Sequence, residues 1–252
     1  MKTDITWILL RGLTRESGHW GEFALQFAQA VPQAQVIALD LPGNGQFHQQ
    51  PSSVSVHAMV AHCRDELALR HVAPPYGVLA MSLGAMVAVA WSRSYPQELA
   101  AQVLINTSMR PFSAFYHRLR PANYGALLKL IFLGANPQEW ERTVLRLTSH
   151  KADAAVLPLW LAIRRQRPVS RANAFRQLLA AIRFKASGDR PLVPTLVLAG
   201  KQDRLVAAQC SEALAQHWRC ALLVHAHAGH DLTLDEGPWV AQQVQQWLLR
   251  LS

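Results

Sequence analysis

Short apolar runs alternate along the chain with longer amphipathic stretches, and this alternation predicts its secondary structure. A short apolar run that is bounded by glycine or proline is typical of a strand covered on both faces. Six such strands are predicted, at residues 6–12, 35–40, 76–82, 101–106, 194–200 and 221–225.

Helical spacing of apolar residues separates most of these strands, at residues 19–30, 54–70 and 83–94. Strands that alternate with helices form βαβ units, whose right-handed crossovers connect parallel strands. The pattern therefore predicts an α/β fold, with a mostly parallel sheet of about six strands flanked by helices.

The alternation is interrupted once, over residues 110–190. No strand-like run occurs there, whereas amphipathic helical patterns occupy residues 126–133, 137–147 and 173–184. We therefore divide the chain into a core, residues 1–109 and 191–252, and a helical insertion, residues 110–190.

Composition limits the class of protein. The 252 residues suffice for one large domain, and because half of them are hydrophobic there is ample material for a buried core. The longest apolar runs are strand-length and the N-terminus lacks a secretory cleavage site, so neither a transmembrane helix nor a signal peptide is predicted. Three scattered cysteines, Cys63, Cys210 and Cys220, are typical of reduced thiols. We expect a cytoplasmic protein.

The net charge of +9 is concentrated in the predicted insertion. Residues 110–190 contain 15 lysines and arginines but only four acids. Such a basic helical face is either a solvated surface or a docking surface for an acidic partner. An acyl carrier protein, an anionic lipid surface or a carboxylate-bearing ester would suit the second interpretation. Nucleic acid is not indicated, because no recognition motif or basic-aromatic platform accompanies the charge.

A candidate nucleophile lies between the third strand and the helix that follows it. In Ala80-Met-Ser82-Leu-Gly84, small residues two positions on either side of the serine permit a sharp turn, which would present the hydroxyl above the sheet. Serine is a weak nucleophile near neutral pH and needs a base that is itself held by an orienting group. A serine that only caps the helix is the alternative interpretation.

The base and its partner are predicted at the ends of the last two strands. Asp203 follows the fifth strand and His230 the sixth, both at the carboxyl ends of parallel strands, where open α/β sheets build their sites. Asp203 could instead be a solvated loop acid. Asp235, ahead of Glu236-Gly-Pro238, is interpreted as a helix N-cap.

The histidines near the sixth strand also raise the question of a metal. His225 and His227 would lie on one face of a strand, close to His230. No nearby carboxylate or cysteine completes a ligand set, so we predict no metal site and treat the first two as packing residues.

Five motifs and the order Ser, Asp, His resemble the α/β-hydrolase family over essentially the whole chain. The motifs are Arg11-Gly12 through Trp20, Asp40-Leu-Pro-Gly-Asn-Gly45, Ala80 to Gly84, Gly200-Lys-Gln-Asp203 and Gly229-His230. The resemblance implies a sheet ordered 2-1-3-4-5-6 and a cap formed by the insertion. It also implies an oxyanion hole made by the backbone N–H groups of Leu13 and Leu83, and no cofactor.

The chain departs from the family at Arg11, where relatives usually have histidine. Because the donor in the oxyanion hole is main chain, the hole can survive, and the arginine side chain is a candidate contact for an anionic group of the substrate. Asn106 lies where some relatives carry the acid, but it cannot serve as a carboxylate. In size, elbow position and cap placement, the chain is similar to pimeloyl-acyl-carrier-protein methyl ester esterases, whose basic caps meet an acidic carrier.

Together these features predict a serine hydrolase that cleaves a small-molecule carboxylic ester through an acyl-enzyme. Ser82 is the predicted nucleophile, His230 the general base and Asp203 the acid that orients the histidine. Thioester or carbon–carbon bond hydrolysis would use the same triad. A non-catalytic binding protein on the same fold is a different class of function, against which the intact triad argues.

Overall fold

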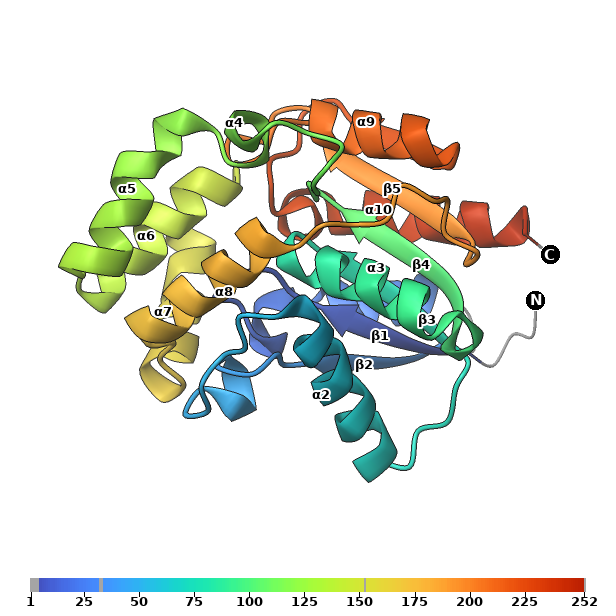
Figure 1. The fold of residues 1–252 in the computed structure, drawn as a ribbon. Coiled ribbons are helices and arrows are strands. Elements are labelled where there is room, and N and C mark those ends of the chain that lie inside the picture. The colour runs from blue at the N-terminus through green and yellow to red at the C-terminus, as the bar shows by residue number, and fades with distance from the viewer. Residues whose placement is uncertain (1–4, 32–33, 152, 252) are drawn as a thin grey trace.

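In the computed structural model, which describes residues 5–31, 34–151 and 153–251, six parallel strands form one sheet (Figure 1). They are β1 (Thr6–Leu10), β2 (Gln35–Leu39), β3 (Tyr76–Met81), β4 (Leu99–Ile105), β5 (Thr195–Gly200) and β6 (Ala221–His225). Their order across the sheet is β2-β1-β3-β4-β5-β6, and each strand pairs in parallel with its neighbours. The predicted fold class and strand order are confirmed.

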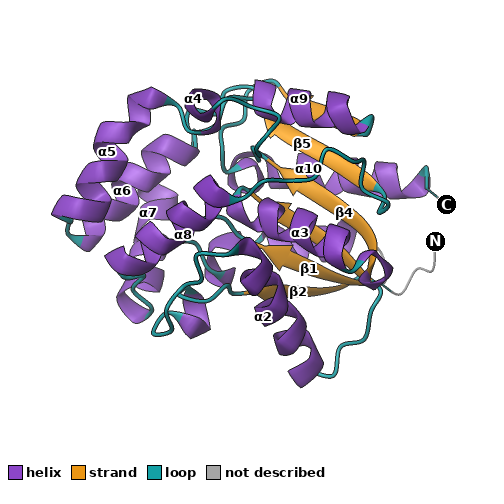
Figure 2. Cartoon of the chain, in the orientation of Figure 1, coloured by secondary structure: helices purple, strands orange, loops and turns teal. Residues whose placement is uncertain are grey.

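Helices cover both faces of this sheet (Figure 2). Successive side chains of each strand point to opposite faces, so the sheet has one apolar layer on each side. In β1, Ile8 and Leu10 belong to one layer, whereas Trp7 and Leu9 belong to the other. The first layer packs against α2 (Val56–Leu69), α3 (Leu83–Ser94) and α9 (Gln209–Trp218). The second packs against α1 (Phe23–Ala30) and α10 (Leu232–Leu249).

The helices of the predicted insertion lie together beyond one end of the sheet (Figure 1). They are α4 (Phe115–Arg118), α5 (Tyr124–Leu128), the π-helical turn η5 (Lys129–Leu133), α6 (Pro137–Thr148), α7 (Asp153–Gln166) and α8 (Arg171–Arg183). Among the described residues between 110 and 190 there is no strand, and a single isolated bridge joins Arg110 to Lys185. We refer to residues 110–190 as the helical segment.

Within the described part of the chain, four short 3-10 helices occur in the connections. They are η1 (Ser17–Trp20), η2 (Gly45–Phe47), η3 (Pro96–Glu98) and η4 (Pro121–Asn123). The predicted helix at residues 19–30 is therefore two elements, η1 and α1, and the pattern at residues 126–133 is divided between α5 and η5.

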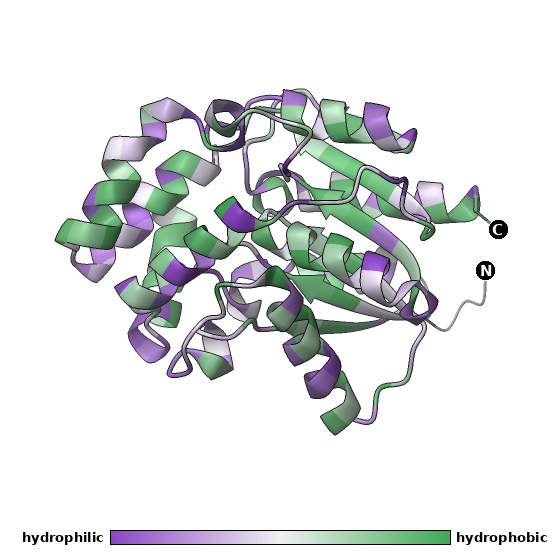
Figure 3. Ribbon diagram, viewed as in Figure 1, coloured by the Kyte–Doolittle hydropathy of each residue, from purple (hydrophilic) through white to green (hydrophobic). Residues whose placement is uncertain are grey.

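Hydropathy follows this architecture (Figure 3). The central strands are mostly apolar, apart from the buried Gln102 of β4, and all six residues of β3 are buried. The helices of the helical segment are amphipathic instead: α6 buries Trp140 and Leu145 but exposes arginines. None of the helices in the described part of the chain is long and apolar enough to cross a membrane.

The last helix begins earlier than the sequence predicts. Asp231 is the N-cap of α10, and its carboxylate accepts the backbone N–H of Leu234. The interpretation of Asp235 as the N-cap is wrong, because Asp235 lies inside α10, next to a kink at Glu236. Its carboxylate accepts hydrogen bonds from another segment, including the backbone N–H of His150.

Candidate active site

Ser82 occupies the turn between β3 and α3 in a conformation that few residues other than glycine adopt. Its φ is 53° and its ψ is −114°, a strained region that persists only where neighbouring contacts enforce it. The Ser82 N–H donates to the Ile105 carbonyl at 3.0 Å, and the Ser82 carbonyl accepts the Thr107 hydroxyl at 3.1 Å. The turn is thus held on both sides by residues at the end of β4.

Two glycines let this turn lie against the end of β1. A Cβ atom on Gly84 would stand 2.5 Å from the Leu10 carbonyl oxygen, and one on Gly12 would stand 3.0 Å from the Ser82 Cβ. A larger residue at Gly84 would push the backbone apart. The absence of side chains here brings the loop after β1, which contains Leu13, next to Ser82.

His230 and Asp203 are joined by a short, buried hydrogen bond. Nδ1 of His230 lies 2.6 Å from Oδ2 of Asp203, and the two side chains are 5% and 1% exposed. The other carboxylate oxygen of Asp203 accepts the backbone N–H groups of Leu205 and Val206 at 2.7 and 2.9 Å. A carboxylate fixed in this way holds the imidazole with Nδ1 toward it and leaves Nε2 as the free ring nitrogen.

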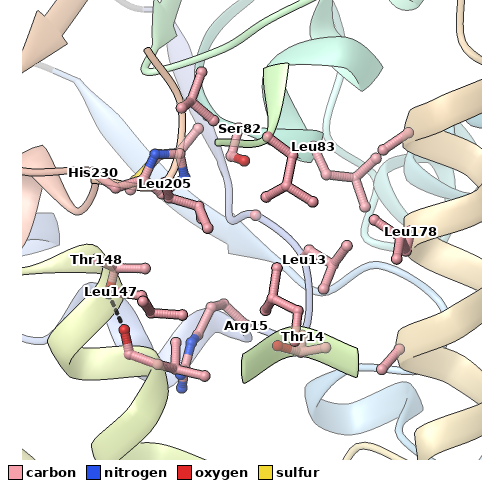
Figure 4. A pocket seen from close by; sticks show the side chains of 18 of the residues that line it. Leu13, Thr14, Arg15, Ser82, Leu83, Leu147, Thr148, Leu178, Leu205 and His230 are labelled. Atoms are coloured by element: carbon pink, nitrogen blue, oxygen red, sulfur yellow. Dashed lines mark hydrogen bonds between the residues drawn. The ribbon is translucent and has the colours of Figure 1, made fainter. Parts of the chain in front are cut away.

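Ser82 and His230 line the same pocket, which has a volume of about 220 Å³. In Figure 4, His230 and Leu205 lie on one side of Ser82, and Leu83 lies on the other. The Ser82 hydroxyl and the His230 ring are not hydrogen-bonded to each other in this structure. Hydrogen bonds between such groups commonly form only when substrate is present.

Most of the pocket wall is apolar, and much of it comes from the helical segment. The apolar residues that the helical segment contributes include Phe115, Leu119, Leu127, Leu130, Ile131, Trp140, Val144, Leu147, Leu178 and Ile182. A cavity with this lining favours an apolar ligand and positions it over the few polar groups at the strand ends.

Leu13 and Leu83, the predicted amide donors, both line this pocket. Leu83 is the first residue of α3, so its N–H has no acceptor within the helix. The main chain around Leu13 is fixed on one side by the N–H of Arg15, which donates to the Gly12 carbonyl at 3.2 Å. On the other side, the N–H of Thr14 donates to a side chain of α8 at 2.8 Å.

That side chain is Gln177, which the sequence analysis did not identify. Gln177 is fully buried, and its Nε2 donates to Asn44 Oδ1 at 2.9 Å and to Ser52 Oγ at 2.8 Å. One turn earlier on α8, Asn173 accepts the Ser52 N–H at 2.9 Å and donates to the Gln50 carbonyl at 2.9 Å. The sequence did contain a signal for these two residues, because two amide side chains four positions apart lie on the same face of a helix, which is otherwise apolar.

Arg11 lines the pocket, but its charged group is bound within the protein. The side chain is 3% exposed, and its Nη1 and Nη2 donate to the two carboxylate oxygens of Asp231 at 3.1 and 2.5 Å. Burial alone would raise the pKa of Asp231, but the charge and hydrogen bonds of Arg11 outweigh burial and lower that pKa. Because Asp231 follows His230 directly, the pair fastens the loop that carries the histidine.

Asn106 holds the same loop from β4. Its Nδ2 donates to the carbonyls of Gly229 and His230 at 2.9 and 2.7 Å, and its Oδ1 accepts the Gly200 N–H at 2.8 Å. Gly200 ends β5, shortly before Asp203. Asn106 therefore joins the loop of the acid to the loop of the histidine, a structural role in place of the carboxylate that some relatives carry.

The other histidines of this region are placed differently. His225 packs against Trp239 with 5.1 Å between ring centroids, and its Nδ1 accepts the Ala228 N–H at 3.1 Å. His227 is exposed. Within residues 5–31, 34–151 and 153–251, no group of three or more histidines, cysteines or acids is arranged to hold a metal ion.

A buried ionic cluster joins the loop after β1 to the helical segment. Arg15 Nη1 lies 2.6 Å from Glu141 Oε2, and Arg164 Nη1 lies 3.2 Å from the other oxygen of the same carboxylate. The Arg15 guanidinium also stacks over the Trp160 ring, 4.2 Å from its centroid. These contacts set α6 and α7 in position above the pocket.

Glu16 makes a second ionic contact at this junction. Its carboxylate lies 3.2 Å from Nη1 of Arg167. Burial, and then the neighbouring charge of Asp40, raise the pKa of Glu16 to about 7, although Arg167 opposes the shift. The strength of this contact should therefore vary with pH near neutrality.

Comparisons with known proteins agree with this architecture. The family model described as alpha/beta hydrolase fold matches residues 8–237. The chain is similar to a hydrolase from Pseudomonas aeruginosa PA01, with 19% identity, a TM-score of 0.79, and 98% of this chain and 91% of that chain covered. It is also similar to a thermophilic esterase from Thermogutta terrifontis, with 20% identity, a TM-score of 0.73, and coverage of 98% and 90%. No curated protein matches.

Proposed function

The chain belongs to the alpha/beta hydrolase family, and from this premise we propose that it is a serine hydrolase that cleaves a carboxylic ester through an acyl-enzyme. One observation carries the proposal. Ser82, at a strained strand-to-helix turn, shares a pocket with His230, whose Nδ1 is held by the buried carboxylate of Asp203. Such an arrangement supplies a nucleophile, a base and an orienting acid.

In the proposed reaction, Ser82 Oγ attacks the carbonyl carbon of the ester. His230 Nε2 takes the hydroxyl proton and returns it to the departing alcohol, and Asp203 stabilises the imidazolium that forms meanwhile. A water molecule then attacks the acyl-enzyme, with His230 again acting as base, and releases the acid. The serine is restored at the end of the cycle.

The negative charge that develops on the carbonyl oxygen needs donors that are fixed in advance. We assign this role to the backbone N–H groups of Leu13 and Leu83, which line the pocket beside Ser82. Each such donor contributes on the order of 10²- to 10³-fold in rate. The hydrogen bond from Thr14 to Gln177 would keep the Leu13 peptide in place.

The apolar pocket favours an ester with an apolar acyl group. Thioester or carbon–carbon bond hydrolysis would use the same three residues, so the leaving group is the open part of this proposal.

Cys63, Cys210 and Cys220 are free thiols in the structure, which supports the proposed cytoplasmic location.

The test is turnover of p-nitrophenyl butyrate by the wild type and by Ser82→Ala. We expect the variant to lose about 10⁴-fold or more in kcat while it keeps its fold, as judged by circular dichroism. A fluorophosphonate probe should label the wild type and not the variant. Ser94→Ala is the matched control, because Ser94 is exposed at the end of α3 and does not line the pocket, so this variant should leave both readouts unchanged.

Undiminished turnover by Ser82→Ala would refute the nucleophile. A folded wild type that neither labels nor turns over any ester would instead favour a non-catalytic binding protein on this fold.

A further inference from the structure

A second cavity lies between the basic helical segment and the loop that follows Asp203. Its volume is about 690 Å³. It is lined by Gly125, Ala126, Lys129, Leu130, Glu139, Arg142, Thr143, Arg146, Ser149, His150, Lys151 and Arg204. We call this cavity the basic groove. Five of its lining residues are lysine or arginine and one is an acid.

Most of the positive charge in the basic groove is not neutralised by the protein. Lys129 pairs with Glu139 at 2.6 Å. For Arg142, Arg146 and Arg204, no carboxylate among the described residues lies within ion-pair distance, and all three side chains are exposed. A concave surface with an excess of one sign of charge concentrates the opposite charge. The basic groove is therefore suited to a multiply charged anion.

The arginines at the junction with the core are different in this respect. Arg164 and Arg167 belong to the same helical segment, and each lies within 3.2 Å of a carboxylate, Glu141 and Glu16 respectively. These two arginines are thus paired with carboxylates at the junction with the core, whereas the three arginines that line the basic groove are not.

The basic groove and the pocket share a wall. Thr148 lines the pocket and the next residue, Ser149, lines the basic groove; Arg204 lines the basic groove and the next residue, Leu205, lines the pocket. Leu130 lines both cavities. Because Arg204 directly follows Asp203, the unpaired charge is close to the proposed catalytic residues along the chain as well as in space.

We infer that the basic groove binds a phosphate-class polyanion carried on the leaving group of the substrate. This inference rests on the proposed ester hydrolysis. The pocket is apolar and suits the acyl group, so the charged part of the substrate is assigned to the other product. Arg142 and Arg146 are one turn apart on α6, and two guanidinium groups at this spacing can bind phosphate oxygens together.

The first experiment measures binding without turnover. Inorganic diphosphate is titrated into full-length Ser82→Ala by calorimetry at low salt, and then into the same protein carrying Arg142→Ala and Arg146→Ala. We expect saturable binding that weakens about tenfold or more in the groove variant, because charge-assisted hydrogen bonds are lost. Added sodium chloride should weaken binding to the parent as well.

The matched control removes the same amount of charge elsewhere in the helical segment. Arg165→Ala and Arg183→Ala alter exposed arginines of α7 and α8 that do not line the basic groove. This pair should change diphosphate binding by less than about twofold, because screened surface charges contribute little. Equal weakening by both pairs of substitutions, or no saturable binding at all, would overturn the site.

The second experiment connects the basic groove to substrate. With Ser82 intact, hydrolysis of a butanoyl ester of glycerol phosphate is compared with that of butanoyl glycerol. We expect the groove substitutions to lower kcat/KM about tenfold for the phosphorylated ester only. If the wild type does not prefer the phosphorylated ester, the assignment to the leaving group is wrong. If neither glycerol ester is hydrolysed although p-nitrophenyl butyrate is, the assignment to the leaving group is wrong as well. If p-nitrophenyl butyrate is not hydrolysed either, the proposed hydrolase function fails, and calorimetry still decides whether the basic groove binds diphosphate.

Discussion

The loops at the strand ends and the helical segment above them are held by different means. Around His230, short hydrogen bonds join neighbouring loops of the sheet: Asn106 binds the backbone on both sides, and two backbone N–H groups fix Asp203. The helical segment is joined to these loops by a few backbone hydrogen bonds, such as that from the Asp231 N–H to the Thr148 carbonyl, and in addition by Gln177 and the ionic pairs of Arg15 and Glu16. The proposed catalytic residues therefore lie on loops that are fixed within the core, whereas the helical segment depends on contacts that cross between the two regions.

The largest expected effect is at the strand ends. Asp203→Asn should keep the loop, since an amide oxygen can still accept the N–H groups of Leu205 and Val206, but it should lower kcat by about 10⁴ because the imidazole loses its orienting charge. Steady-state turnover measures this. Asp189→Asn, at an exposed acid paired with Arg93, is the control. A loss of less than about tenfold in Asp203→Asn would remove Asp203 from the proposed triad.

Substitution of Arg11 tests whether the stability of the strand ends depends on the buried ion pair between Arg11 and Asp231. Arg11→Met would leave the carboxylate of Asp231 buried without its partner, and we expect a loss of about 3–5 kcal/mol in the free energy of unfolding. Adding Asp231→Asn removes that charge while an N-cap residue is kept, so the double variant should recover part of the loss. Urea unfolding gives both values.

The same variant separates two roles for Arg11. If Arg11 instead contacts an anionic group of the substrate, Arg11→Met would raise KM for anionic esters selectively and leave the unfolding free energy nearly unchanged.

The pH dependence of stability tests the contact of Glu16 with Arg167, which joins the core to the helical segment. Its pKa of about 7 lies above the ordinary value of 4.5. Stability from the neutral carboxyl is fully present below about pH 4.5 and is lost as the pH rises through 7. Between pH 5 and 8, the unfolding free energy of the wild type should fall by on the order of 2 kcal/mol relative to Glu16→Gln. Parallel pH profiles for the two proteins would show that Glu16 titrates normally.

Substitution of Gln177 is expected to give the smallest effect on kcat, and it can be compared directly with substitution of Asn173 on the same helix. Gln177→Ala leaves the Thr14 N–H without its acceptor and should lower kcat about tenfold, with a smaller change in KM, as the Leu13 peptide shifts. Asn173→Ala is the matched control: it removes hydrogen bonds from the same helix to the loop at Ser52, but none to Thr14. Both variants should lose about 1–3 kcal/mol of stability. An equal loss of kcat in both would reject a positioning role for Gln177.

The sequence was informative wherever the pattern is local. Apolar runs predicted six strands within two residues of their bounds, because a strand buried on both faces needs continuous apolar residues. Ser82 could be located because small residues must flank a sharp turn, and Gly84 indeed has the Leu10 carbonyl 2.5 Å from where its Cβ would be. The sequence pattern gave the wrong N-cap at Asp235, because the helix is capped four residues earlier by Asp231.

What the sequence by itself determined was the parallel sheet and the strand ends at which Ser82, Asp203 and His230 lie, while the strand order followed from the resemblance to the family. Only the tertiary structure decided what each polar group binds. Arg11 pairs with Asp231 across 220 positions, and Thr14 donates to Gln177 across 163. The physical reason is that periodicity encodes which face of an element is buried, whereas a hydrogen bond depends on the distance between two elements after the chain has folded.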